Sequence, residues 1–266
     1  MFALGALPAP GLAAWAYALG QAMVSAGQLT AHYANEYADV EADRGIANRT
    51  LFSGGSGVLG AGGLPPRVAL VAALVTSAIV VCAAAVLAFE SLVVIPLALF
   101  ALCVSWLYSM PPVRLLGTGW GELATSLVVA GAVPLMGAAS QSASPPAALW
   151  WSVVVLLPVH MALMLAFEIP DLESDAAAGK RVLAVRMGRR CAGTLMAALL
   201  AAAASLLAVA VVAGGLPARS GLLAGSAALP VGVMLYAWRS HRHGWFTASA
   251  VAALVCAAGG LLAGRL

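Results

Sequence analysis

The sequence predicts an all-α protein, a bundle of about eight transmembrane helices that forms a single domain over residues 1–266. Hydrophobic residues make up 63% of the chain and charged residues only 9%, whereas charged residues are roughly 25% of an average soluble domain. The mean hydropathy is +0.99, so the polar side chains are too few to cover a water-facing surface. These values exclude an ordinary soluble protein and make membrane lipid an expected partner.

Charged residues and clusters of proline and glycine divide the chain into eight apolar segments. A helix needs about 20 largely apolar residues to cross a membrane. The predicted spans are 12–38, 68–89, 91–109, 120–140, 147–170, 191–214, 220–238 and 245–264. None shows the strict alternation of a membrane β-strand, so spanning helices are the remaining solution.

Lysine and arginine residues are concentrated on one side of this arrangement. If the connection 39–67 faces that side, helix alternation also places 110–119, 171–190 and 239–244 there. These connections hold 11 of the 13 basic residues, namely Arg44, Arg49, Arg67, Arg114, Lys180, Arg181, Arg186, Arg189, Arg190, Arg239 and Arg242. The positive-inside rule then predicts an integral membrane protein with these loops in the cytoplasm and its N-terminus outside.

The four cysteines and the net charge argue against several other classes of protein. Cys82, Cys103, Cys191 and Cys256 have no metal-ligand spacing and lie far apart in the sequence, so we expect buried, unpaired cysteines. The net charge is only +3, and the chain has no basic arm or aromatic-rich basic patch. Nucleic acid is therefore not an expected partner.

Most of the acidic residues fall into two clusters at the cytoplasmic ends of the first and fifth predicted spans. The clusters are Glu36, Asp39, Glu41 and Asp43, and Glu168, Asp171, Glu173 and Asp175. Each contains two aspartates four residues apart, a spacing that a helix places on one face. Like charges at that distance repel unless a cation lies nearby. Mg²⁺ binds through a few carboxylates while keeping water and phosphate oxygens, so a shared magnesium site is predicted, with Asn35 one turn before Asp39 as a neutral ligand.

Basic residues accompany both acidic clusters. Arg44, Arg49, Lys180 and Arg181 lie beside them in the sequence, and Arg114 lies in the loop between them. A diphosphate site needs both signs of charge, because metal ions and fixed cations together neutralise the phosphate oxygens. The pattern therefore indicates a substrate with a diphosphate head at the membrane face and a hydrocarbon tail among the helices.

Three segments of the sequence carry a family resemblance. Asn35–Asp43 reads NEYADVEAD, Tyr108–Leu115 reads YSMPPVRL and is followed by Gly121 and Glu122, and Asp171–Gly188 reads DLESDAAAGKRVLAVRMG. In this order and spacing, over about residues 20 to 190, they resemble the signatures of UbiA-type intramembrane aromatic prenyltransferases.

The resemblance implies a helical bundle in which two Asp-rich loops hold Mg²⁺ and an isoprenyl diphosphate. The acceptor that it implies is an aromatic compound or quinone precursor. Matched by position, the implied metal ligands are Asn35, Asp39, Asp43, Asp171 and Asp175. The implied diphosphate-binding residues are Asn35, Arg49, Arg114, Lys180 and Arg181. The four aspartates and Tyr108, which would lie near the reacting carbon, are the implied catalytic residues.

The sequence departs from the family pattern at three points. Asn35 comes after one predicted span where the family usually has two, so either the family's first helix is missing or the chain starts late. A missing helix would remove one wall of the substrate cavity. Leu116 stands near the position where many relatives have a lysine. Glu168 stands where naphthoate-type members often have an asparagine, so it is a candidate extra metal ligand or acceptor-side base.

The implied reaction is ionisation of an allylic diphosphate followed by attack of an acceptor carbon on the cation. Tyr108 or Trp106 is the aromatic group expected to shield the cation. Glu168 and His160 are candidates for the base, although His160 is expected rather to be a hydrogen-bonded core histidine. Three alternatives stay open, namely a terpene cyclase of the same fold, a cation-coupled transporter and a non-catalytic scaffold. The acids lie at helix ends rather than at mid-bilayer, which disfavours transport.

Overall fold

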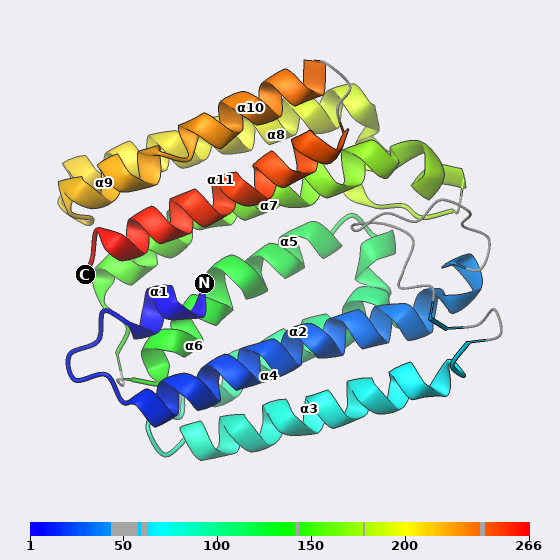
Figure 1. Ribbon diagram of the computed structural model, residues 1–266, viewed down its shortest axis with the longest axis horizontal. Helices are drawn as coiled ribbons and strands as arrows, with labels where there is room; N and C mark the ends of the chain where they lie inside the picture. Colours follow the sequence, from blue (N-terminus) through cyan, green and yellow to red (C-terminus); the bar gives the residue numbers. More distant parts are fainter. Residues whose placement is uncertain (44–57, 60–62, 142–143, 178, 240–242) are drawn as a thin grey trace.

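The computed structural model of the chain describes residues 1–43, 58–59, 63–141, 144–177, 179–239 and 243–266. In this part of the chain the long helices lie roughly side by side (Figure 1), and no strand is present beyond an isolated bridge between Leu59 and Leu64. The α-helices are α1 (Phe2–Ala6), α2 (Ala14–Asp43), α3 (Arg67–Leu87), α4 (Val94–Ser109), α5 (Gly121–Ser126), α6 (Val133–Ala139), α7 (Ala147–Ala177), α8 (Leu183–Val212), α9 (Ala218–Gly225), α10 (Ala228–Arg239) and α11 (His243–Ala263). The prediction of an all-α membrane bundle is confirmed.

Each predicted span corresponds to a helix or to a run of consecutive helices. Within the described residues, six segments are long and apolar enough to cross a membrane: α3, α5 to α6, α7, α8, α9 to α10, and α11. Helix α4 is equally apolar but has only 16 residues. Helix α2 has 30 residues and is more polar, with Gln21 and Gln28 in its sequence. The predicted spans thus correspond to real helices, two of which differ in length or polarity from a simple apolar span.

Two helices run beyond the apolar windows that predicted them. Helix α2 continues to Asp43 and α7 continues to Ala177. The acidic motifs therefore lie on the last turns of helices, and the expectation of two Asp-rich loops is corrected. The reason is that a helix end beyond the membrane carries polar residues, which hydropathy reads as a loop.

Helix α8 begins earlier than predicted and is interrupted near its start. It starts at Leu183, and Gly188 within it has φ 76° and ψ 158°, which is not helical. A positive φ costs glycine nothing because it has no Cβ. Gly188 therefore separates a short first turn, Leu183–Met187, from the long membrane helix that follows.

A five-residue helix, α1, precedes α2, where the resemblance led us to expect a missing helix. It is too short to span, but it packs tightly on α6. A Cβ placed on Gly5 would clash with the carbonyl oxygen of Pro134. Residues 1–13 thus contribute a short buried helix and no additional span.

Alanine is the commonest residue in the buried clusters between the helices, as expected when lipid rather than water surrounds a bundle. One buried cluster joins α1, α2, α3, α4 and α6, and another joins α7, α8, α10 and α11. Helix α5 and the π-helix η2 (Leu127–Ala132) connect to α6 between these two groups (Figure 1). The charged motifs are placed where the two groups meet.

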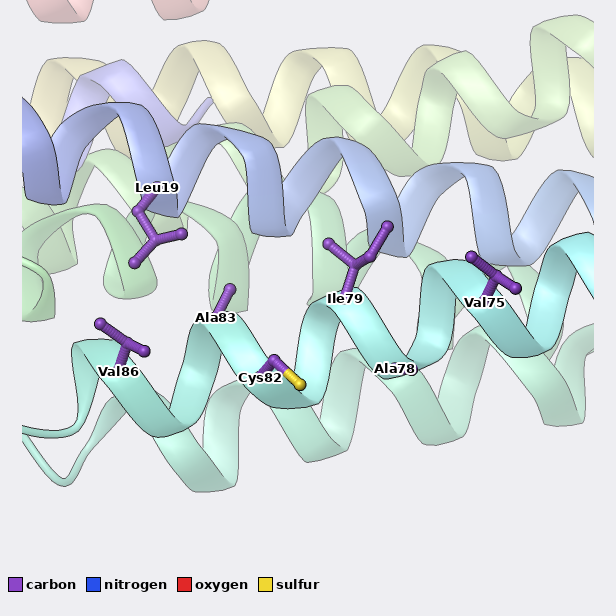
Figure 2. Close-up of a pocket in the computed structure, with 7 residues that line it drawn as sticks. All are labelled: Leu19, Val75, Ala78, Ile79, Cys82, Ala83 and Val86. Carbon is purple, nitrogen blue, oxygen red and sulfur yellow. The ribbon is translucent and has the colours of Figure 1, made fainter.

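The outer face of α3 is apolar and hollowed. A groove of about 450 Å³ between α2 and α3 is lined by residues such as Leu19, Ile79 and Cys82 (Figure 2). Its lining is apolar and carries none of the charged motifs, so we assign it to the lipid-facing surface. Cys82, Cys103 and Cys191 are exposed, so the prediction of buried cysteines is wrong for these three, because alanine-rich faces leave small side chains uncovered by protein.

Candidate active site

Asp39 is the centre of a polar cluster at the end of the bundle where α2 and α7 end and α5 begins (Figure 1). Its side chain is only 3% exposed. The amide nitrogen of Asn35, one turn earlier on α2, donates to Oδ2 of Asp39 at 3.0 Å and to Oγ of Ser109 at 3.0 Å. Asn35 thus fixes the carboxylate of Asp39 against the end of α4. Ser109 was not predicted, although it follows Tyr108 within the second motif.

Two cations from distant parts of the sequence neutralise Asp39. Nη2 of Arg114 lies 2.7 Å from Oδ1 of Asp39, and Nζ of Lys180 lies 3.7 Å from Oδ2. The same ammonium group lies 3.9 Å from Oδ1 of Asp175 on α7. Burial of an unpaired carboxylate is costly, so these cations stabilise the site. The two acidic motifs therefore face one shared cation.

The backbone geometry of Arg114 is unusual. Its φ of 45° lies in the left-handed region, and no other non-glycine residue in the described part of the chain has a positive φ. That conformation costs an L-residue roughly 1–2 kcal/mol. Its carbonyl accepts a hydrogen bond from the amide of Gly117 at 2.8 Å, and its amide donates to Met110 at 3.0 Å. The turn and the ion pair to Asp39 together hold Arg114 in this conformation.

A helix C-cap places Lys180. Gly179 has φ 73° and its amide donates to the carbonyl of Ala176 at 3.1 Å, while the amide of Lys180 donates to Asp175 at 2.9 Å. This pair of bonds is the Schellman motif, which ends a helix with a glycine in the left-handed conformation. The chain reverses there and returns the lysine side chain to the carboxylate of Asp175.

Several predicted residues lie at the edge of the cluster or outside the described part of the chain. Asp171 is half-buried on α7 one turn before Asp175, a spacing that puts both on one face. Arg181 is exposed. The side chain of Asp43 and the whole of Arg49 lie outside the described residues.

Tyr108 lies among the acidic residues at the end of α4. Its electrostatic neighbours are Glu168, Glu122, Asp175 and Asp39. A Cβ placed on Gly121 would lie 3.0 Å from Cε2 of Tyr108, so the glycine lets the ring pack on the start of α5. Tyr108 is therefore an aromatic side chain that lies near acidic residues of both motifs.

Trp106 and Leu116 are engaged away from this cluster. The indole nitrogen of Trp106 donates to Oγ of Ser77 on α3 at 3.0 Å. This contact does not support Trp106 as a cation shield, and Tyr108 is the remaining candidate for that role. Leu116 is 4% exposed, so it packs in the interior.

Both candidate bases, His160 and Glu168, form hydrogen bonds inside the bundle. Nδ1 of His160 lies 2.9 Å from Oγ of Ser126, and His160 is 5% exposed, which confirms a hydrogen-bonded core histidine. Oε2 of Glu168 accepts the backbone amide of Ala184 at 3.0 Å. Glu168 therefore caps α8, a contact that its position in the sequence did not reveal.

Arg186 is a residue of this site that the sequence did not single out. Its Nε donates to the carbonyl of Arg181 at 3.0 Å and its Nη2 to the carbonyl of Gly117 at 3.1 Å. It thereby ties the turn that follows Lys180 to the turn that follows Arg114. Only its place among the basic residues of 171–190 was visible in the sequence.

The family model of the UbiA prenyltransferase family matches residues 1–255. The chain belongs to this family. Membership supports prenyl transfer within a membrane as the general activity, and with the apolar helices it indicates an integral membrane protein.

Solved structures of the same fold agree with this membership. The chain is similar to the apo structure of a UbiA homolog from Aeropyrum pernix K1, with a TM-score of 0.72, 22% identity, and coverage of 100% of this chain and 96% of that one. It is also similar to a structure of digeranylgeranylglyceryl phosphate synthase, with a TM-score of 0.69, 13% identity, and coverage of 98% and 90%. No curated protein sequence matches the chain significantly.

The oxygen ligands of this UbiA-family site suit the magnesium ion that the family implies. Asp171 and Asp175 offer neighbouring carboxylates on α7, and Asp39 faces the same ammonium group from α2. Within the described residues, no three His, Cys, Asp or Glu side chains converge closely enough to hold a metal ion by themselves. Mg²⁺ binds proteins through one or two carboxylates and completes its shell with water and substrate phosphate, so the donor chemistry of Asp171 and Asp175 matches its usual protein ligands.

Proposed function

We propose that this protein transfers an isoprenyl group from an isoprenyl diphosphate to an aromatic or quinone-precursor acceptor, with Mg²⁺ as cofactor. The observation that carries the proposal is the shared ammonium group of Lys180, 3.7 Å from Asp39 and 3.9 Å from Asp175. It brings both acidic motifs and two cations to one place at the end of an apolar bundle. A diphosphate head with a long apolar tail matches both halves of that arrangement.

The cations would bind the diphosphate. Arg114 is 44% exposed while its partner Asp39 is 3% exposed, so an anion arriving from outside meets the guanidinium group first. Arginine binds phosphate with two parallel N–H donors, and lysine adds a mobile point charge. Arg114 and Lys180 would therefore stabilise negative charge as the allylic carbon–oxygen bond breaks.

The carboxylates would hold the metal. Asp171 and Asp175 on α7, with Asp39, Asp43 and Asn35 on α2, are the residues that would bind Mg²⁺. Bound Mg²⁺ supplies charge neutralisation of the leaving diphosphate. The acceptor carbon would then bond to the allylic carbon, and its proton would pass to the released diphosphate. Tyr108, which lies near acidic residues of both motifs, would shield the cation with its ring face.

We further propose that this end of the bundle faces the cytoplasm. Arg114 and Lys180 pair with Asp39 at this end, and Arg186 donates to the carbonyl of Gly117 beside them. Arg181 and Arg189 lie close to these residues in the sequence. At the opposite end, Arg219 and Arg265 donate to the carbonyls of Gly264 and Leu4, so those two arginines are used in internal contacts. An excess of lysine and arginine marks the cytoplasmic side.

The test is turnover by the purified protein in lipid nanodiscs. Labelled isoprenyl diphosphates of several chain lengths are supplied with Mg²⁺, with and without aromatic acceptors, and pyrophosphate and prenylated product are measured. Acceptor-dependent pyrophosphate release with a prenylated acceptor supports the proposal. A cyclised product formed without an acceptor indicates a terpene cyclase, and ion flux without pyrophosphate release indicates a transporter; either result contradicts it.

A further inference from the structure

Two buried carboxyl groups hold the start of α8. Oε1 of Glu122 on α5 accepts the backbone amide of Leu183 at 2.9 Å, and Oε2 of Glu168 on α7 accepts that of Ala184 at 3.0 Å. Glu122 is 1% exposed and Glu168 8% exposed. The N-cap residue Val182 makes no side-chain capping bond. The two glutamates therefore satisfy amides that a helix start leaves without intrahelical partners.

The second oxygen of each carboxyl group is left without a donor. Oε2 of Glu122 and Oε1 of Glu168 are buried and have no hydrogen-bond partner among the described residues. Because the two carboxyl groups bind the amides of successive residues, Leu183 and Ala184, they lie close together at the start of α8. Two ionised carboxylates in that position repel. One proton held between them satisfies both oxygens, because a protonated carboxyl group is a donor as well as an acceptor.

The turn that this pair holds is connected to both cations of the site. Lys180 lies just ahead of Leu183 in the chain and contacts Asp39 and Asp175. Arg186, on the same turn, donates to the carbonyl of Gly117 in the loop that carries Arg114. A shift of the first turn of α8 therefore moves Lys180 directly and the Arg114 loop through Arg186.

We propose that Glu122 and Glu168 are a proton-sharing pair of positioning residues, which fix the first turn of α8 so that Lys180 and Arg114 are placed to bind the diphosphate. The inference rests on the proposed function for the diphosphate. It goes beyond that function by assigning both acids to helix positioning instead of to metal binding or proton abstraction. A shared proton also explains how two acids are accommodated side by side in an apolar bundle.

Glutamine is the substitution that separates these roles. Its carbonyl oxygen can accept the backbone amide, and its NH₂ group can donate to the remaining carboxylate in place of the shared proton. Glu122→Gln and Glu168→Gln are each expected to stay within about threefold of the wild-type kcat/KM, because no buried group loses a partner. Glu122→Ala and Glu168→Ala are each expected to raise KM for the isoprenyl diphosphate about tenfold, with a smaller change in kcat, because a backbone amide and a carboxylate lose their partners.

The double variant E122Q/E168Q is expected to raise KM by more than the effects of the two single variants combined. If both carbonyls keep the backbone amides, two NH₂ groups face each other with no acceptor, and KM should rise about tenfold, as in the alanine variants. The matched control is Glu173→Gln, which makes the same chemical change on α7 at a side chain that is 90% exposed. If the alanine variants do not fold, the contrast between single and double glutamine variants carries the test.

Amide hydrogen exchange at Leu183 and Ala184 gives a readout that needs no turnover. We expect protection in the wild type and in the single glutamine variants, and exchange about tenfold faster or more in the alanine variants. Inactivation by Glu168→Gln in a folded protein would identify a proton acceptor and overturn the proposal. Unchanged exchange in both alanine variants would overturn it too. A wild type that releases no pyrophosphate contradicts the proposed function, while the exchange experiment still decides whether the pair holds α8.

Discussion

Arg114 and Asp39 form an asymmetric ion pair in which the anion is buried and the cation faces outward. Nη2 of the arginine lies 2.7 Å from Oδ1 of the aspartate, and the two side chains are 44% and 3% exposed. A buried carboxylate with amide and guanidinium donors is held in place. The exposed part of the guanidinium group faces outward, so under the proposed function one contact would both neutralise Asp39 and present a diphosphate-binding group.

Removal of the carboxylates should abolish turnover without unfolding the protein. Asp39→Ala and, separately, Asp171→Ala are expected to lower pyrophosphate release about 100-fold or more, since each removes charge on which metal and diphosphate binding depend. Glu173→Ala, on an exposed part of α7, is the control and should retain activity. Circular dichroism and thermal unfolding in detergent check the fold. Full activity of either aspartate variant would remove the basis of the proposed site.

Arg114 offers a comparison between charge and backbone strain. Arg114→Ala and Arg114→Gly both lose the ion pair to Asp39, and both should raise KM for the isoprenyl diphosphate. Because the φ of 45° suits glycine, the glycine variant should be more stable than the alanine variant by about 1 kcal/mol. Thermal unfolding of the two proteins measures the difference. A glycine variant no more stable than the alanine variant would mean that the turn relaxes once the ion pair is gone.

Metal removal should stop the reaction reversibly. We expect EDTA to eliminate pyrophosphate release and excess Mg²⁺ to restore it, because the carboxylates alone leave the leaving diphosphate without its counter-charge. Ca²⁺, which is larger and takes more ligands, should restore much less activity. Undiminished turnover after exhaustive chelation would exclude the proposed cofactor.

The orientation can be tested with a single cysteine at an exposed site. Glu173 is 90% exposed on α7, next to the site. In a protein whose native cysteines are replaced by alanine, Glu173→Cys should react with a membrane-impermeant maleimide in inside-out vesicles and not in intact cells. Arg219→Cys, near the other end of the bundle, is the reciprocal control. Labelling of Glu173→Cys in intact cells would reverse the proposed topology.

The contact between α1 and α6 should be sensitive to a single methyl group. Gly5→Ala places a Cβ against the carbonyl oxygen of Pro134, whereas Gly225 on α9 has open space where a Cβ would go. We expect Gly5→Ala to destabilise the protein by about 1–3 kcal/mol and Gly225→Ala to have little effect. Thermal unfolding in detergent compares the two. Equal stability would show that α1 adjusts its position without cost.

Hydropathy predicted the helices well but not their polar ends. All eight apolar windows correspond to helices or to runs of consecutive helices, because membrane insertion requires long apolar segments with satisfied backbones. The last turns of α2 and α7 and the first turn of α8 were read as connections, because polar helical turns outside the membrane carry no hydropathy signal. The start of α8 depends on Glu122 and Glu168, which bind its first amides from other helices.

The candidate site was predicted in part. Spacing brought out Asn35, Asp39, Asp171 and Asp175, and the structure places Asp39 and Asp175 around Lys180. Ser109 and Arg186 were missed as site residues, because a lone hydroxyl or one arginine among several has no distinguishing pattern. Trp106 and Glu168 were given chemical roles that their hydrogen bonds to Ser77 and Ala184 do not support.

The sequence by itself determined that this chain is a membrane helix bundle with two acidic motifs, since hydropathy and helical spacing are local properties. Only the tertiary structure decided which acids would face cations and which would bind backbone amides. Asp39 and Asp175 lie near the ammonium group of Lys180, whereas Glu122 and Glu168 accept the amides of Leu183 and Ala184. The physical reason is that a carboxylate's environment is set by neighbouring helices, whose approach and rotation depend on the packing of small side chains throughout the bundle.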